Sequence, residues 1–193
     1  MRIILGSASP RRKQLLSLII TDFTVVVSDI EEIVTQNDPA LVAVELAEQK
    51  ATAVCTLLDC DEDALVIGAD TIVFTDRILG KPADEEEAVQ MLRSLSGITH
   101  SVVTGVCVKS TRTGEKESFY SETKVEFVKL SEEEIQRYVK SGEPLDKAGA
   151  YGIQGVAARF IKNINGCYYN VVGLPIQKLS ESLRNMGYSD LLP

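Results

Sequence analysis

The chain has 193 residues, of which 45% are apolar and 25% charged, and its formal net charge at pH 7 is −8. These proportions are typical of a soluble globular protein and exclude fibrous and disordered classes, and no apolar run approaches the ~20 residues that a membrane-spanning helix needs. The acidic balance disfavours binding to the phosphate backbone of DNA or RNA, but it leaves room for a local cluster of cations around a small anion.

The length predicts a single domain over residues 1–193, or one core split into two lobes, because domains commonly have about 150 residues. The N-terminal sequence MRIILGSASPRR places its charges after a very short apolar run, the wrong order for a secretory signal. No CxxC pair is present, so idle thiols in a cytosolic protein are expected. The single histidine, His100, excludes a multi-histidine zinc site. The cysteines are Cys55, Cys60, Cys107 and Cys167.

The first half of the chain alternates between strand and helix signals. An apolar strand over residues 2–6 ends at Gly6, and Ser9 and Pro10 then form the N-cap and first position of a helix over residues 10–18. The next expected elements are a strand at 23–27, a helix at 39–58 capped by Asp38, a buried strand at 64–68 that stays extended through 72–74, and a helix at 85–95 capped by Asp84.

The second half contains two hairpin signals. Two long strands are expected at 101–109 and 117–128, joined by a turn at 111–114, and a second hairpin pairs 160–164 with 168–172 around Asn165-Gly166. A capping box of Ser131 and Glu134 opens a helix that Gly142 ends, and another helix covers 175–186. The chain is therefore expected to be an α/β protein with parallel and antiparallel pairing in one elongated sheet.

Three consecutive cations stand at the start of the first helix. The segment Gly6-Ser7-Ala8-Ser9-Pro10-Arg11-Arg12-Lys13 takes the chain from a strand through a small-residue turn into a helix N-terminus. The helix dipole disfavours cations at this end, and an anionic ligand would remove that conflict. Two interpretations are open here, a phosphate site and a solvated basic helix face.

Asp70 follows a continuous apolar strand, which is where open α/β sheets place functional groups. It could hold a metal ion, act as a base, or be satisfied by neighbouring backbone N–H groups. A haloacid-dehalogenase phosphatase would carry a second Asp two residues later, and Ile72 stands there instead.

The remaining candidates are weaker when they are taken alone. The glycines of residues 146–155 suit either a close backbone approach to a ligand or a tight structural loop. Gly80-Lys81-Pro82 lacks the rest of a P-loop, and Lys50 is interpreted locally as a solvated lysine and His100 as structural. Together, the cation cluster, the strand-end carboxylate and the lysines favour phosphoanhydride chemistry with a divalent metal.

In their order along the chain, these segments resemble the Maf family of nucleoside triphosphate pyrophosphatases. The resemblance covers nearly the whole chain, and the combination of segments is specific although each piece alone is not. The matching stretches are SASPRRKQLL (7–16), Glu31-Glu32, Lys50, GADTIV (68–73), GKP (80–82), LSGITHSVVTG (95–105), EPLDKAGAYGIQG (143–155) and VVGLP (171–175).

This resemblance implies a fold and an activity. The fold would be an elongated mixed sheet flanked by helices, similar to inosine-triphosphate pyrophosphatases, with the active site in a cleft between two lobes. The activity would be hydrolysis of nucleoside triphosphates to monophosphate and pyrophosphate with Mg²⁺ or Mn²⁺. The resemblance also implies a cytoplasmic protein, and because members of the family are often dimeric it is compatible with a homodimer. The acidic balance and the short apolar runs predict that the protein binds neither nucleic acid nor membrane.

The resemblance assigns roles residue by residue. Asp70 matches the family's proton acceptor, which activates water, and it pairs with Glu32 as a metal-binding position. Ser7, Arg12, Lys50 and Lys81 match polar positions that line the phosphate and metal region. Arg11, Thr71 and Gln154 match the positions that separate subgroups by base, and here they resemble the dTTP/UTP subgroup.

The family is named for septum inhibition, so a second function stays open. In that alternative the domain is a nucleotide-binding regulator of cell division with little catalytic role. An enzyme needs Asp70 for rate, whereas a binding protein does not need it for affinity.

Overall fold

The computed structural model describes residues 1–59 and 61–193, so Cys60 lies outside the described residues. The contacts between residues divide the chain into two compact units. Unit 1 comprises residues 1–70, 104–121 and 173–193, and unit 2 comprises residues 71–103 and 122–172. A single domain over residues 1–193, with a cleft between two lobes, stays a prediction.

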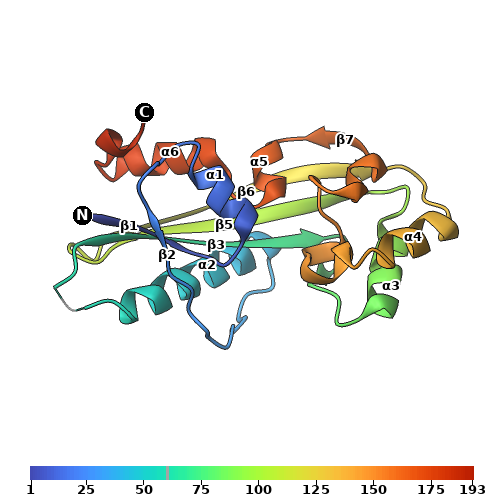
Figure 1. The fold of residues 1–193 in the computed structure, drawn as a ribbon, viewed down its shortest axis with the longest axis horizontal. Coiled ribbons are helices and arrows are strands. Elements are labelled where there is room, and N and C mark those ends of the chain that lie inside the picture. The colour runs from blue at the N-terminus through green and yellow to red at the C-terminus, as the bar shows by residue number, and fades with distance from the viewer. Residues whose placement is uncertain (60) are drawn as a thin grey trace. The chain divides into compact units, whose positions relative to one another are not determined.

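One seven-stranded sheet has the strand order β2-β1-β3-β5-β6-β7, with β4 paired to β3 (Figure 1). Strand β1 pairs in parallel with β2 and β3, whereas the β3–β4 and β6–β7 pairs are antiparallel. The predicted mixed sheet is therefore confirmed. Its strands are β1 (Arg2–Gly6), β2 (Thr24–Val25), β3 (Ala64–Phe74), β4 (Ile78–Leu79), β5 (Thr99–Ser110), β6 (Lys116–Phe127) and β7 (Ile161–Asn165).

Helices flank the strands. In unit 1, α2 covers one face of the strands, and α1 and α6 cover the other (Figure 1). The four predicted N-caps, Ser9, Asp38, Asp84 and Ser131, each accept a backbone hydrogen bond from the first turn of their helix. The helices are α1 (Pro10–Leu16), α2 (Pro39–Thr56), α3 (Glu85–Leu95), α4 (Glu132–Val139), α5 (Tyr168–Val172) and α6 (Ile176–Asn185).

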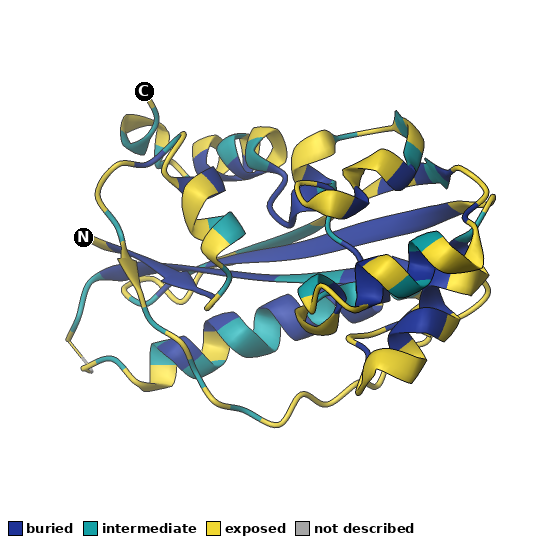
Figure 2. Cartoon of the chain, turned by 45° about the vertical axis from the view of Figure 1, so that its right-hand side comes forward, coloured by how far each residue is buried: buried dark blue, intermediate teal, exposed yellow. Residues whose placement is uncertain are grey.

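Two glycines let α2 lie directly on the sheet of unit 1. A Cβ on Gly68 would stand 2.4 Å from the carbonyl oxygen of Ala47, and a Cβ on Gly105 would stand 2.2 Å from that of Ala43. Separations this short are forbidden to real Cβ atoms, so only glycine permits this packing. Figure 2 shows the long strands that α2 covers largely in the dark blue of buried residues.

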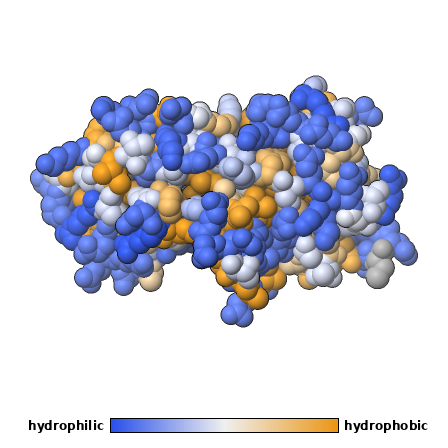
Figure 3. Space-filling view, turned by 180° about the vertical axis from the view of Figure 1, so that it is seen from behind, coloured by the Kyte–Doolittle hydropathy of each residue, from blue (hydrophilic) through white to orange (hydrophobic). Residues whose placement is uncertain are grey.

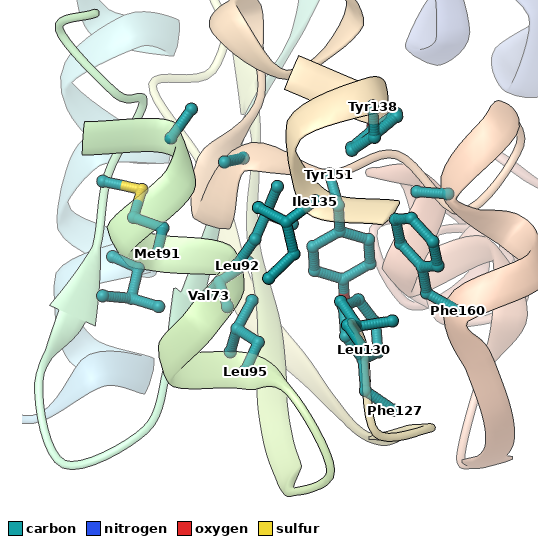
Figure 4. Close-up of a cluster of buried hydrophobic side chains, with 14 of the residues drawn as sticks. Val73, Met91, Leu92, Leu95, Phe127, Leu130, Ile135, Tyr138, Tyr151 and Phe160 are labelled. Atoms are coloured by element: carbon teal, nitrogen blue, oxygen red, sulfur yellow. The ribbon is translucent and has the colours of Figure 1, made fainter. Parts of the chain in front are cut away.

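Unit 2 has a core of aliphatic and aromatic side chains, in which α3 and α4 contribute Leu92, Leu95 and Ile135 (Figure 4). His100 is only 2% exposed and lies edge-on to the rings of Phe127 and Tyr151. Its Nε2 is 2.7 Å from the Tyr151 hydroxyl oxygen. The structural interpretation of His100 is therefore confirmed.

The prediction of a strand over residues 168–172 is wrong, because this segment forms helix α5. The adjacent Tyr168 and Tyr169 are both exposed, which a half-buried strand would not allow. Asn170 is fully buried, and its amide donates to the carbonyl of Val102 and the hydroxyl of Thr123, both at 2.9 Å. These contacts outweigh the strand preference of the tyrosines and valines.

The strand predicted at residues 23–27 is confirmed only over Thr24–Val25, where both residues are exposed. The part of the helix predicted beyond Leu16 is replaced by turns.

Cys55, Cys107 and Cys167 are free thiols, as expected. No helix among the described residues is long and apolar enough to cross a membrane. The face seen in Figure 3 is largely hydrophilic with apolar residues between the polar ones.

Candidate active site

The turn between β1 and α1 directs Arg12 back toward Ser7. The Arg12 Nη1 donates to the Ser7 hydroxyl at 3.1 Å, and its Nε donates to the carbonyl of Gly173 at 2.8 Å. Ser7 is buried, and its hydroxyl also accepts from the backbone N–H of Ser9. Arg12 is therefore fixed at two of its nitrogens. A solvated basic face is the wrong interpretation for Arg12, whereas Lys13 is exposed.

Lys50 joins two carboxylates. Its Nζ donates to the Asp70 carboxylate in a short hydrogen bond and lies 2.9 Å from Oε1 of Glu32. The side chains of Lys50 and Asp70 are 20% and 15% exposed, so this contact is largely shielded from water. The local interpretation of Lys50 as a solvated lysine is therefore wrong.

The packing of α2 explains why Lys50 reaches Asp70. The close approach at Gly68 seats the helix turn between Ala47 and Ala51 directly on β3, two residues before Asp70. Lys50 belongs to that turn, so its side chain extends along the strand toward the carboxylate. Sequence composition alone does not reveal this placement, because it depends on how closely α2 packs against the strands at Gly68 and Gly105.

Two side chains of α2 hold the irregular segment that carries Glu32. Gln49 accepts from the backbone N–H of Ile33 at 3.0 Å and donates to its carbonyl, and Glu45 accepts from both the N–H and the hydroxyl of Thr35. The bonds from Thr35 lower the pKa of Glu45. The sequence analysis did not predict these roles of Gln49 and Glu45. The only indication in the sequence was that both residues lie on the helix that carries Lys50.

The electrostatics of unit 1 connect these groups. The pKa of Arg12 is lowered, and burial of its guanidinium is the main cause. The positive charge of Arg11 also lowers this pKa, whereas the carboxylates of Asp70 and Glu32 act in the opposite direction. Six of the predicted residues therefore interact within unit 1, and Lys50 links the two carboxylates among them. These residues are Ser7, Arg11, Arg12, Glu32, Lys50 and Asp70.

The other predicted residues belong to unit 2. Thr71 follows Asp70 directly in β3, Lys81 is exposed on the segment between β4 and α3, and Gln154 is exposed on the loop over residues 146–155. The N–H of Gly149 donates to the carbonyl of Gly80 at 3.0 Å, which ties this loop to the segment that carries Lys81.

The glycines of this loop support the structural interpretation over close approach to a ligand. A Cβ on Gly149 would lie 2.9 Å from the side chain of Val73, and one on Gly155 would lie 1.9 Å from the carboxylate of Glu143. A Cβ on Gly152 would meet the side chain of Lys147 at 2.8 Å. These glycines make room for neighbouring side chains of the same unit.

The site of unit 1 combines cations that suit a polyanionic ligand with carboxylates that suit a metal ion or an attacking water. On a mixed α/β sheet, this defines a protein equipped to bind a phosphorylated ligand and act on it. The family model described as "Maf-like protein" matches residues 2–186. The chain therefore belongs to the Maf-like protein family.

Several curated relatives share one name. The dTTP/UTP pyrophosphatase of Agathobacter rectalis is 51% identical over 201 residues, covering 96% of this chain and 98% of the relative. That of Alkaliphilus metalliredigens is 47% identical over 192 residues, covering 99% of both. That of Bacillus cereus strain G9842 is 51% identical over 185 residues, covering 95% and 94%.

Proposed function

We propose that this protein hydrolyses nucleoside triphosphates to a nucleoside monophosphate and pyrophosphate, and that dTTP and UTP are its favoured substrates. The shared name of relatives that match almost end to end supports this activity. The observation that carries the proposal is the bridge from Lys50 to Asp70 and Glu32, beside the fixed guanidinium of Arg12.

The cations and Asp70 have different roles in the proposed reaction. Arg11, Arg12, Lys50 and Lys81 supply positive charge for the triphosphate and for the departing pyrophosphate. Asp70 accepts a proton from water as the water oxygen bonds to the phosphorus of the α phosphate. The bond between the α and β phosphates breaks, and pyrophosphate leaves with the negative charge that these cations stabilise.

A divalent metal fits the carboxylates of this site. Glu32 and Asp70 lie near enough to share one ammonium group, and carboxylate oxygens are the ligands that Mg²⁺ and Mn²⁺ prefer. No cluster of three or more His, Cys, Asp or Glu ligands occurs within residues 1–59 and 61–193, so substrate phosphates would complete the coordination. When bound, the metal would neutralise phosphate charge and polarise the reacting phosphoryl group.

The base would be recognised by Gln154. Uracil and thymine present an N3–H donor between two carbonyl acceptors, which a glutamine amide can match. Cytosine reverses part of this pattern, and each unmatched buried group costs roughly 1–3 kcal/mol. The 5-methyl group that separates thymine from uracil is worth only about 1 kcal/mol, too little for a strict choice.

A nucleotide panel tests this proposal. With Mg²⁺ or Mn²⁺ present, we expect kcat/KM for UTP and dTTP to agree within about tenfold and to exceed the values for CTP and GTP by about tenfold or more. The measurement is initial-rate hydrolysis of each nucleotide, with pyrophosphate and orthophosphate scored separately. A preference for GTP would contradict the base assignment even if pyrophosphate is released.

A further inference from the structure

The carboxylate of Glu143 lies inside the loop that carries Gln154. Its Oε1 accepts from the hydroxyl of Tyr138 at 3.0 Å, and its Oε2 accepts from the backbone N–H of Val156 at 3.1 Å. Tyr138 is 1% exposed and packs edge-on against Phe160 in the core of unit 2 (Figure 4). One side chain thus connects the core to the C-terminal end of the loop.

The loop folds closely around this connection. The position of a Cβ on Gly155 is already filled by the Glu143 carboxylate, at 1.9 Å, and that of Gly152 by the aliphatic part of Lys147. Lys147 also donates to the carbonyl of Glu143 and to Asp146. Between the two glycines, Ile153 is buried and Gln154 is exposed. The backbone on both sides of Gln154 is therefore held from within the loop.

We infer that Glu143 is a positioning residue for base selection: it holds the loop of residues 146–155 so that Gln154 presents its amide in one orientation. The inference rests on the proposed function, in which Gln154 contacts the base. Glu143 acts here by accepting two hydrogen bonds, and its charge takes no part in the reaction.

Three variants separate hydrogen bonding from charge. Glu143→Ala removes the acceptor for both Tyr138 and Val156. Glu143→Gln keeps both contacts, because its amide oxygen can accept from Val156 and its amide nitrogen can donate to the Tyr138 hydroxyl oxygen. Tyr138→Phe leaves the contact between Glu143 and Val156 in place and removes the bonds of the hydroxyl to Glu143 and to the backbone of Gly152, so it tests the inference even where Glu143→Ala fails to fold. Glu133→Ala, an exposed carboxylate of α4 paired with Arg137, is the matched control.

The readouts are the ratio of kcat/KM for UTP to that for CTP, and amide hydrogen exchange over residues 147–156. We expect Glu143→Ala to lower the ratio about tenfold through KM for UTP, with kcat changed less than about threefold, and to speed exchange in the loop. Glu143→Gln and Glu133→Ala retain the wild-type ratio and exchange, and Tyr138→Phe lies between. In a Gln154→Ala background, Glu143→Ala lowers the ratio no further, because both changes remove the same contact.

The inference is overturned if Gln154→Ala abolishes the preference for UTP while Glu143→Ala leaves it intact. It is equally overturned if Glu143→Gln loses as much as Glu143→Ala, because charge would then be the operative property. A wild-type protein with no preference for UTP contradicts the proposed base choice and the role in selection together. Loop exchange then shows separately whether Glu143 holds the loop, and unchanged exchange in Glu143→Ala would refute that as well.

Discussion

Replacing Asp70 by Asn should lower kcat by about 100-fold or more, because the variant lacks both a proton acceptor and a charged metal ligand. Asn has the same shape and keeps an oxygen that accepts from Lys50, and Lys50 keeps its contact with Glu32. The fold should therefore persist, and nucleotide affinity should be retained because a negative charge near the triphosphate is removed.

The measurement compares kcat for UTP with the dissociation constant of a non-hydrolysable UTP analogue, in the wild type and the variant. Glu48→Gln is the control, because Glu48 also lies on α2 and pairs with a lysine, Lys116, but contacts none of the proposed site residues. Near-normal turnover in Asp70→Asn would eliminate both roles of Asp70.

Acidification from pH 7 to pH 5 should destabilise the wild type by about 2 kcal/mol relative to His100→Gln. Burial lowers the pKa of His100 from 6.5 to about 4, so the folded protein holds its imidazole neutral. The Nδ1 atom is buried without a hydrogen-bond partner among the described residues, so a proton there would gain no acceptor. The unfolded chain takes up this proton near pH 6.5.

The sign of the effect follows from this difference in proton uptake. The stabilisation by neutral His100 is complete above about pH 6.5 and is lost progressively as the pH falls toward 4. The test is urea unfolding of both proteins at pH 7, 6 and 5. The carboxylates are the same in the two proteins, so their titrations cancel in the comparison. His100 is the single histidine, so no other histidine titrates in this pH range. A difference in unfolding free energy that does not change with pH would contradict the prediction.

Local signals in the sequence were enough to predict most helices and strands. Ser9, Asp38, Asp84 and Ser131 cap their helices as expected, because an N-cap depends on bonds to residues only two or three positions away. The segment 168–172 could not be predicted in this way. Its helix depends on Asn170 reaching strands about 50 and 70 positions earlier in the chain, where it outweighs the local preference for a strand.

In the candidate site, too, features set by neighbouring residues could be predicted, whereas contacts between residues distant in sequence could not. Charge and strand ends singled out Arg12 and Asp70, but the partners that fix them are distant in sequence. Arg12 binds the carbonyl of Gly173, and Lys50 reaches Asp70 only because Gly68 lets α2 approach the strand. A helical pattern shows which face of a helix is apolar, but it does not show how near the helix comes to its neighbour.

The products formed from UTP test the central claim most directly. The wild-type protein is incubated with UTP and Mg²⁺, and the products are separated by ion-exchange chromatography, with Asp70→Asn run in parallel to exclude a contaminating activity. The proposed chemistry predicts UMP and pyrophosphate in equal amounts at all times, with no UDP. Release of UDP with orthophosphate would place the cleavage at the terminal phosphate and contradict the assignment.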